Sequence, residues 1–259
     1  MKLPRTPLIA IATILGLIAA AGLFILPRLQ PRDAPCVARE FEGSRFIVCT
    51  YDARRQDMRL YSHAPNGGGY LRSFEALQSA LGADARHVRF AMNAGMFNEA
   101  GAPIGLYVQD GEEQKAISLT DGPGNFHLKP NGVFWQGDDG ALHIEVSESY
   151  ARELRTPRWA TQSGPMLLID GELHPRIADD GASRLIRNGV GLRDGHTAYF
   201  VLSSGFVSFG RFARFFRDEL KCRDALFLDG TVSSIWAPSI GRYDDNHELG
   251  PMVVVLDRR

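Results

Sequence analysis

The stretch that decides the fold is residues 190–202, which read Val190-Gly-Leu-Arg-Asp194-Gly195-His-Thr-Ala-Tyr-Phe-Val-Leu202. Two apolar runs flank an Asp-Gly pair, which between apolar segments is the strongest short sequence signal for a β-hairpin. The same signal recurs at Asp110-Gly111, Asp139-Gly140 and Asp170-Gly171. The chain therefore predicts an α+β fold with a mostly antiparallel or mixed β core and a few flanking helices.

Two segments between the predicted strands have helical patterns. Ser73 can cap residues 74–81, and Ser208 can cap a second helix. The apolar stripe of the second helix is interpreted as core packing, and it consists of Phe209, Phe212, Ala213, Phe216 and Leu220. Residues 225–228 form an apolar run typical of a buried strand, which ends at Asp229.

The start of the chain has a different character. Residues 8–26 carry no charge and no proline. At about 1.5 Å per residue they would span roughly 28 Å, close to the hydrocarbon thickness of a bilayer. Lys2 and Arg5 precede this run, so we expect an N-terminal transmembrane helix whose start stays in the cytoplasm. Residues 1–34 are interpreted as signal anchor and tether, although Ala19-Ala20-Ala21 leaves a cleavable signal peptide as an alternative.

Composition excludes one class of partner. Hydrophobic residues make up 44% of the 259 residues and charged residues 23%, as in an ordinary globular protein. With 29 basic and 30 acidic residues the net charge is −1, so no basic field is available for nucleic acid. Residues 35–259 show no second linker and no repeat, which predicts one domain.

The three cysteines suit an oxidising compartment. Cys36 and Cys49 flank a predicted hairpin with Glu42-Gly43-Ser44 as its turn, which brings them near register, so we expect a disulfide between them. Pairing of either with Cys222 is the alternative. The sequence has no Cys-x-x-Cys pair and no His spacing typical of ligands, so no metal or cofactor is expected; a divalent cation near Asp229 stays open.

Four segments place glycines and small polar residues directly after apolar runs, where loops present functional groups on a rigid scaffold. They are Asn93-Ala-Gly95-Met-Phe97, Gln162-Ser163-Gly164-Pro165-Met-Leu, Arg187-Asn-Gly-Val-Gly191 and Leu228-Asp229-Gly230-Thr231-Val-Ser233-Ser234. Each segment alone is typical of turn chemistry. It is their joint presence, in this order, that is informative.

Together the segments resemble the motifs of the phosphodiester glycosidase family, to which the lysosomal-enzyme uncovering glycosidase belongs. The family patterns resemble Asn-[Ala/Gly]-Gly-x-Phe, Gln-[Ser/Ala]-Gly-Pro-x-Leu, Arg-x-x-[Val/Ile]-Gly and Leu-Asp-Gly-Gly-x-Ser-Ser. The resemblance runs from about Phe46 to the C-terminus, and the segment from Lys129 to Phe134 is part of it. Thr231 departs from the pattern, which has a second glycine there. The chain looks like the small bacterial branch, which lacks the extra domains of the animal enzymes. Together with the predicted N-terminal anchor, this leads us to expect a single-pass protein of the inner membrane whose catalytic domain faces the periplasm or the exterior.

The resemblance implies a hydrolase that cleaves the bond between a sugar's anomeric carbon and a phosphodiester, on envelope or exported glycans. Such a reaction requires a carboxyl for proton transfer, assigned to Asp229, and a cation for the phosphate, assigned to Arg187. The predicted substrate-binding residues are Asn93, Gly95, Gln162, Ser163, Gly164, Gly230, Ser233 and Ser234. One alternative is a non-catalytic glycan- or cell-wall-binding protein on the same scaffold. Another is a phosphodiesterase that cuts the P–O bond, which normally employs metals.

Overall fold

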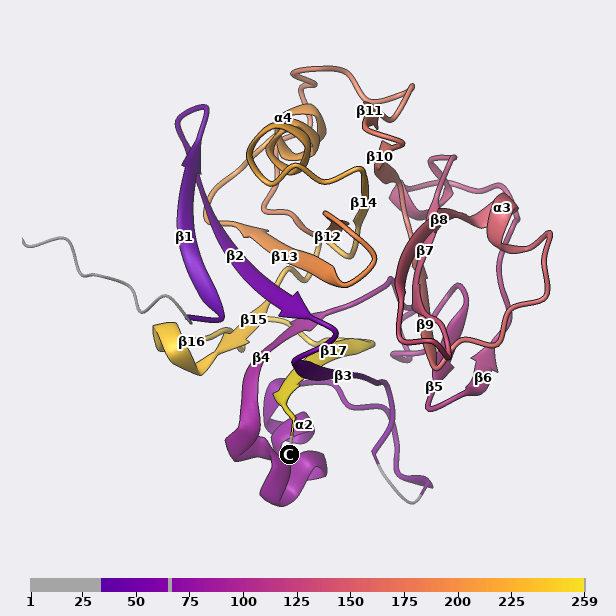
Figure 1. The fold of residues 1–259 in the computed structure, drawn as a ribbon, viewed down its shortest axis with the longest axis vertical. Helices are drawn as coiled ribbons and strands as arrows, with labels where there is room; N and C mark the ends of the chain where they lie inside the picture. The colour runs from indigo at the N-terminus through magenta and orange to yellow at the C-terminus, as the bar shows by residue number, and fades with distance from the viewer. Residues whose placement is uncertain (1–33, 65–66, 259) are drawn as a thin grey trace, which may run out of the picture. The chain divides into compact units, whose positions relative to one another are not determined.

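Three antiparallel β-sheets make up the described part of the chain (Figure 1). The computed structural model describes residues 34–64 and 67–258, and residues 34–259 form one compact unit. Sheet A has the strand order β1-β2-β13-β12-β14-β10-β11, sheet B the order β16-β15-β4-β17-β3, and sheet C the order β6-β5-β9-β7-β8. The predicted class, α+β with a mostly antiparallel core, is confirmed.

The elements have the following bounds. Sheet A consists of β1 (Cys36–Phe41), β2 (Ser44–Asp52), β10 (Met166–Ile169), β11 (Glu172–Leu173), β12 (Asn188–Leu192), β13 (Thr197–Ser203) and β14 (Asp224–Phe227). Sheet B consists of β3 (Gln56–Tyr61), β4 (Val88–Asn93), β15 (Ile235–Ala237), β16 (Arg242–Tyr243) and β17 (Met252–Asp257). Sheet C consists of β5 (Tyr107–Gln109), β6 (Glu112–Lys115), β7 (Gly132–Gln136), β8 (Leu142–Val146) and β9 (Trp159–Ser163). The helices are α2 (Phe74–Leu81), α3 (Ser147–Tyr150) and α4 (Phe209–Arg214), and α4 continues as a π-helical turn over Phe215–Glu219.

All four predicted Asp-Gly hairpins form. They join β5 to β6, β7 to β8, β10 to β11 and β12 to β13. At Asp110-Gly111 and Asp170-Gly171 both residues have positive φ, between 52° and 86°. Two consecutive left-handed residues define the type I′ turn, whose twist matches that of the flanking strands. The local turn chemistry therefore sets the strand register at these places.

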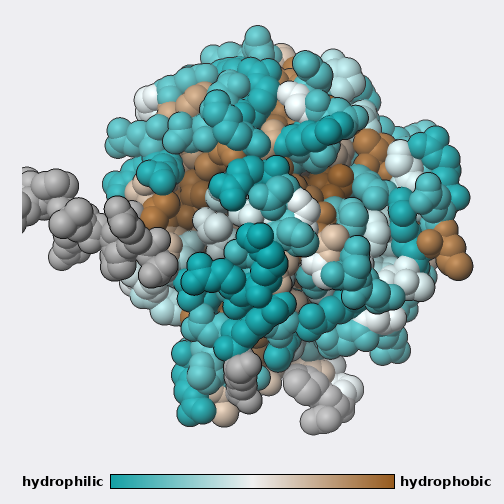
Figure 2. Space-filling model, viewed as in Figure 1, coloured by the Kyte–Doolittle hydropathy of each residue, from teal (hydrophilic) through white to brown (hydrophobic). Residues whose placement is uncertain are grey.

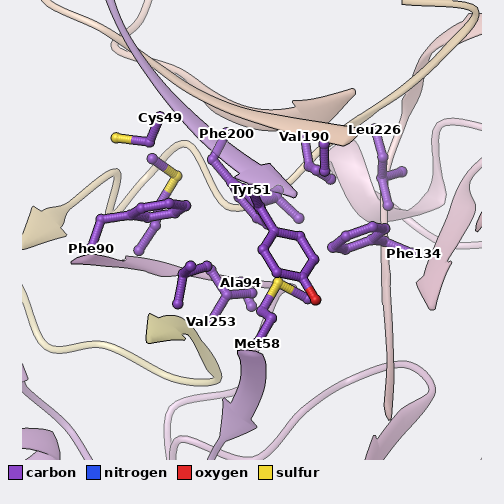
Figure 3. Close-up of a cluster of buried hydrophobic side chains, with 14 of the residues drawn as sticks. Cys49, Tyr51, Met58, Phe90, Ala94, Phe134, Val190, Phe200, Leu226 and Val253 are labelled. Atoms are coloured by element: carbon purple, nitrogen blue, oxygen red, sulfur yellow. The ribbon is translucent and has the colours of Figure 1, made fainter. Parts of the chain in front are cut away.

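The inner faces of the three sheets meet in one hydrophobic core. Phe200 of sheet A lies 5.5 Å from Phe90 of sheet B and 5.8 Å from Phe134 of sheet C, measured between ring centroids. Tyr51 and Val253 pack into the same cluster, and Figure 3 shows these side chains converging from separate strands. Because rings at this spacing are in contact, the sheets are fixed against one another by close packing.

Each sheet has its outer face covered by a helix, and both faces of most strands are therefore buried. Helix α4 and the π turn cover sheet A, α2 covers sheet B, and Tyr150 of α3 packs on sheet C. The predicted caps are confirmed: Ser73 accepts from the backbone N–H of Ala76, and Ser208 accepts from that of Arg211. The predicted aromatic stripe of α4 lies in the core, as expected.

The first hairpin is closed by a disulfide. β1 pairs with β2 in a register that places Cys36 opposite Cys49, and the two are bonded, which confirms the predicted pairing. Cys222 is buried and free. In the range from residue 34 to 258, apart from 65 and 66, no helix is long and apolar enough to cross a membrane; the predicted span, residues 8–26, lies outside the described residues.

We expect the disulfide to stabilise the fold measurably. It closes a loop with a sequence separation of 13 residues. Loops of this size lower the entropy of the unfolded chain enough to contribute about 3 kcal/mol. Urea unfolding of the double variant Cys36→Ser, Cys49→Ser should show a loss of about 2–3 kcal/mol. A reductant should destabilise the wild type and leave the double variant unchanged; equal sensitivity of both proteins would contradict the expectation.

Candidate active site

One strand end from each sheet reaches the same point in the interior. Asn93 is the last residue of β4 in sheet B, and Ser163 is the last residue of β9 in sheet C. In sheet A, Asn188 begins β12 beside the end of β14, where Leu228 and Asp229 follow. All four motif segments of the sequence therefore contribute to one place in the fold.

Two buried asparagines connect these strand ends. The side-chain nitrogen of Asn188 donates to the side-chain oxygen of Asn93 at 2.9 Å and to its backbone oxygen at 3.1 Å. The same side-chain oxygen of Asn93 accepts from the backbone N–H of Ser234 at 2.9 Å. The Asn93 amide nitrogen in turn donates to the backbone oxygen of Asp229 at 2.9 Å. We call Asn93 and Asn188 the asparagine pair; it fixes both ends of the 229–234 turn.

Further contacts hold the turn from the side of sheet C. The Ser163 hydroxyl donates to the backbone oxygen of Leu228 at 3.1 Å, and the backbone N–H of Leu228 donates to the oxygen of Asn188. Within the turn, the Ser233 hydroxyl donates to the oxygen of Gly230 at 3.1 Å. The backbone that leads into Asp229 is thus held by all three sheets.

Two glycines make this approach possible. A Cβ atom at Gly95 would collide with the backbone oxygen of Gln162, and one at Gly164 would lie 2.6 Å from the Cβ of Asn131. Side chains at these positions would force the segments apart. Thr231 occupies the position where the family pattern has glycine, and its backbone is outside the left-handed region, so a side chain fits there without strain.

Gln162 holds a separate loop. Its side-chain oxygen accepts from the backbone N–H groups of Leu106 and Ser118, both at 2.9 Å. Its nitrogen donates to the oxygen of Ser118 at 2.7 Å and to the hydroxyl of Ser147 at 2.9 Å. The side chain is 1% exposed, so both ends of the amide are occupied by the protein itself. A sugar could reach this amide only by displacing one of these bonds.

Asp229 carries the carboxylate of the site. It is half-buried, and one carboxylate oxygen accepts from the backbone N–H of Thr231 at 3.1 Å. Burial raises the pKa of Asp229 above the ordinary value, and the Thr231 bond opposes this only in part. No salt bridge to Asp229 occurs among residues 34–64 and 67–258, so no cation offsets its desolvation. A carboxyl of this kind exchanges protons nearer to neutral pH than an exposed one.

Arg187 lies next to Asn188 in sequence, but its side chain makes different contacts. The side chain is fully buried, its Nε donates to the oxygen of Val207 at 3.0 Å, and one terminal nitrogen donates to the oxygen of Ser183 at 3.0 Å. The guanidinium carbon lies 3.5 Å from the centre of the Phe209 ring, a cation–π contact. Burial lowers the pKa of Arg187 to about 10, so it stays protonated at neutral pH.

The Arg187 guanidinium is charged, buried and incompletely bonded. Its other terminal nitrogen, Nη1, has no hydrogen-bond partner, and none of the described carboxylates forms a salt bridge with it. The Phe227 ring lies between this group and the Asp229 turn: it is 5.6 Å from the guanidinium, and a Cβ at Gly230 would lie 2.6 Å from it. The two predicted catalytic residues, Arg187 and Asp229, are therefore not in direct contact; the ring of Phe227 packs against both the guanidinium and the turn.

Among the predicted residues, the structure joins one group directly at the turn: Asn93, Ser163, Asp229, Gly230, Ser233 and Ser234. Gly95, Gln162 and Gly164 support this group from behind, and Arg187 lies beyond Phe227. Asn188 was missed by sequence reasoning, although it lies inside the third motif. An amide at the start of an otherwise apolar, glycine-rich strand was the signal available for it.

The described residues offer little for a metal ion. No group of three or more His, Cys, Asp or Glu side chains in this part of the chain is placed to hold one. Two cavities lie away from the asparagine pair. One, of about 350 Å³, is lined by paired charges such as Asp57 and Arg158, and the other, of about 210 Å³, includes His143 and Asp224.

Comparison with known proteins places this geometry in a family. The family model described as phosphodiester glycosidase matches residues 86–254, which include all four motif segments. The chain is 34% identical over 189 residues to the uncharacterized protein YigE of Escherichia coli (strain K12), covering 72% of each protein.

Two solved structures share the fold. One is the zebrafish N-acetylglucosamine-1-phosphodiester alpha-N-acetylglucosaminidase catalytic domain, auto-inhibited by its pro-peptide: TM-score 0.61, 13% identity, 89% of this chain and 86% of that one covered. The other is a hypothetical protein from Synechocystis, with a TM-score of 0.52, 13% identity, and 86% of this chain and 61% of that one covered. On the match of the family model, this chain belongs to the phosphodiester glycosidase family.

Proposed function

We propose that this protein hydrolyses the bond between the anomeric carbon of a sugar and a phosphodiester oxygen, on envelope or exported glycans. The observation that carries the proposal is a half-buried carboxylate, Asp229, on a turn that all three sheets hold in place. Membership of the family supports the reaction class. The fold shared with the zebrafish glycosidase domain is compatible with it.

Asp229 is assigned the role of general base. A phosphate group leaves readily as an anion, so its departure requires little proton donation, whereas attack by water requires a base. The raised pKa makes Asp229 a stronger base than an exposed aspartate. The water oxygen forms the new bond to the anomeric carbon, the bond from that carbon to the phosphate oxygen breaks, and Asp229 takes the water proton. The phosphate keeps its bridging oxygen and its second ester.

Arg187 is assigned to the phosphate. A buried, protonated guanidinium without a counter-ion is costly, and an anion that bonds to Nη1 would offset that cost. Gly230 and Ser233, at the rim of the turn, are assigned to substrate contact. Four residues whose side chains bond to the protein itself are assigned to positioning instead: Asn93, Gln162, Ser163 and Ser234. Gly95 and Gly164 allow the close approach of their segments.

The proposed location is the inner membrane of a bacterium, with residues 8–26 as the anchor and the catalytic domain in the periplasm or outside the cell. The disulfide between Cys36 and Cys49 supports an exported domain, because such bonds persist in oxidising compartments and are rare in the cytosol.

Asp229→Asn should remove turnover and leave the fold intact. The amide keeps the shape of the side chain but cannot accept the water proton, so kcat should fall by about 10²–10⁴-fold. Burial raises the pKa of Asp229 in the folded state, so the fold disfavours the ionised form at pH 7, and the variant should be as stable as the wild type or more so. The assay uses an aryl phosphodiester of N-acetylglucosamine 1-phosphate or of a related sugar, with urea unfolding beside it.

The pH profile tests the direction of proton transfer. As a base, Asp229 must be ionised, so kcat/KM should fall as the pH drops through its raised pKa, and this acidic limb should be absent from any residual activity of Asp229→Asn. Asp245→Asn, at an exposed carboxylate, is the matched control. If a folded Asp229→Asn variant kept the wild-type kcat, Asp229 would not be the catalytic carboxyl. No turnover of any sugar in a panel by the wild type would favour the glycan-binding alternative.

Asn188 should act on turnover more than on substrate binding. Asn188→Ala removes both bonds to Asn93, and loss of buried hydrogen bonds costs about 1–3 kcal/mol of stability. With the turn loosened, kcat should fall at least tenfold while KM changes by less than about threefold. Asn188→Asp, which loses the donor but keeps the shape, should resemble alanine in activity. An increase in KM alone would instead indicate that Asn188 contacts the substrate.

Arg187 should be required for binding of phosphate. Inorganic phosphate that bonds to Nη1 stabilises only the folded state, so millimolar phosphate should raise the Tm of the wild type by a few degrees. Arg187→Met removes the charge and keeps most of the packing against Phe209, and its Tm should not respond to phosphate. Arg45→Met, at an exposed arginine, is the control and should respond like the wild type. A phosphate response that survives Arg187→Met would place the anion elsewhere.

A further inference from the structure

Two exposed apolar side chains, those of Ile186 and Phe206, lie next to an antiparallel bridge beside the candidate site. Leu185 is 46% exposed, Ile186 38% and Phe206 69%. Leu185 and Val207 form an antiparallel bridge with backbone bonds in both directions, and this pairing sets Ile186 opposite Phe206. Single exposed apolar residues need no explanation, whereas contiguous exposed apolar surface is a feature of binding sites. Leu185 points to the same face as buried Val207, because neighbouring side chains of an extended segment alternate. We call Ile186 and Phe206 the apolar ledge.

The apolar ledge adjoins the turn that carries Asp229. A Cβ at Gly230 would lie 3.3 Å from the backbone oxygen of Ile186, so the two backbones are in contact next to the carboxylate. The asparagine pair contacts the same turn through hydrogen bonds from Asn93 to Asp229 and from Ser234 to Asn93. The carboxylate thus has hydrogen-bonding groups on one flank and exposed hydrocarbon on the other.

A cation lies behind the ledge. Arg187 follows Ile186 directly, and its guanidinium has an unpartnered nitrogen and no carboxylate partner among the described residues. Partly buried Phe209 and Met96 pack in the same cluster as Val207. A positive charge set among apolar side chains complements a phosphate that carries a hydrocarbon group, since the charge meets the phosphate and the ledge removes apolar surface from water. Figure 2 shows that hydrophobic residues interrupt an otherwise hydrophilic surface on the viewed face of the molecule.

We propose that the apolar ledge binds the hydrocarbon part of the alcohol esterified to the substrate's phosphate, so the substrates are glycosyl phosphodiesters of apolar alcohols. The inference rests on the function proposed above and extends it to the group that leaves. Water adds to the anomeric carbon, the sugar is released with a free hydroxyl, and the apolar alcohol departs with the phosphate still attached.

The test compares two substrates that differ only in the alcohol. Methyl and octyl diesters of one sugar 1-phosphate are assayed below the micelle concentration of the octyl ester. Burial of part of the octyl group on the ledge should make wild-type kcat/KM for the octyl ester about tenfold higher than for the methyl ester. Phe206→Ser and Ile186→Ser should bring this ratio close to one. Leu154→Ser, at a residue 98% exposed and outside the ledge, should keep the wild-type ratio.

Several results would overturn the proposal. A wild-type ratio near one would do so, and so would a Phe206→Ser variant that loses activity on both esters equally, because the residue would then serve the fold. Binding to phospholipid vesicles that depends on Phe206, with a ratio near one, would assign the ledge to a membrane surface instead.

Failure of the proposed function gives a different result. If the wild type hydrolyses neither ester, calorimetry with octyl phosphate and inorganic phosphate decides the inference alone. Tighter binding of octyl phosphate that is lost in Phe206→Ser would support the ledge without the reaction. Equal binding of the two ligands would overturn it.

Discussion

The need to satisfy buried backbone groups at the ends of strands governs this structure. Where β4 and β14 end at one interior point, the backbone oxygens of Asn93, Leu228 and Asp229 lack partners in a strand ladder. Amide and hydroxyl side chains replace those partners, among them Asn93, Ser163 and Asn188. An apolar residue at any of these positions would leave a buried polar group unsatisfied. Three sheets can therefore meet around Phe200 only if polar side chains close their ends.

The candidate site follows from that constraint. Bonds that satisfy the backbone also fix the main chain on both sides of Asp229, from Leu228 to Ser234. Within residues 34–64 and 67–258, the carboxylate itself accepts one hydrogen bond, from the backbone N–H of Thr231, so most of its hydrogen-bonding capacity is open to a substrate or water. A rigid backbone with a free functional group is the arrangement that catalysis by orientation requires. The bonds that hold the turn and the carboxylate that reacts thus involve different atoms of neighbouring residues.

The fold was predictable where the signals are local. Each Asp-Gly pair encodes its own turn, and the register that places Cys36 opposite Cys49 follows from a local hairpin of six residue pairs. The partners of Gln162, by contrast, lie 44 and 56 residues away, and nothing in its own segment indicates them. The sequence predicts Arg187 as a phosphate ligand, but it does not predict the burial of Arg187 against Phe209, because that contact depends on where α4 packs. Motif order showed which segments belong together, but not which side chains bond to the protein and which stay open.

The disulfide at the open end of the first hairpin also decides how the domain responds to force. β1 is an edge strand, and a pull on the chain before Cys36 would by itself break its backbone bonds to β2 one at a time, as a zipper opens. The bond from Cys36 to Cys49 carries that load directly into β2, which lies between β1 and β13 in sheet A. Tension at the N-terminal side then bypasses the ladder between β1 and β2 and acts on β2, which seven residue pairs with β13 hold in sheet A.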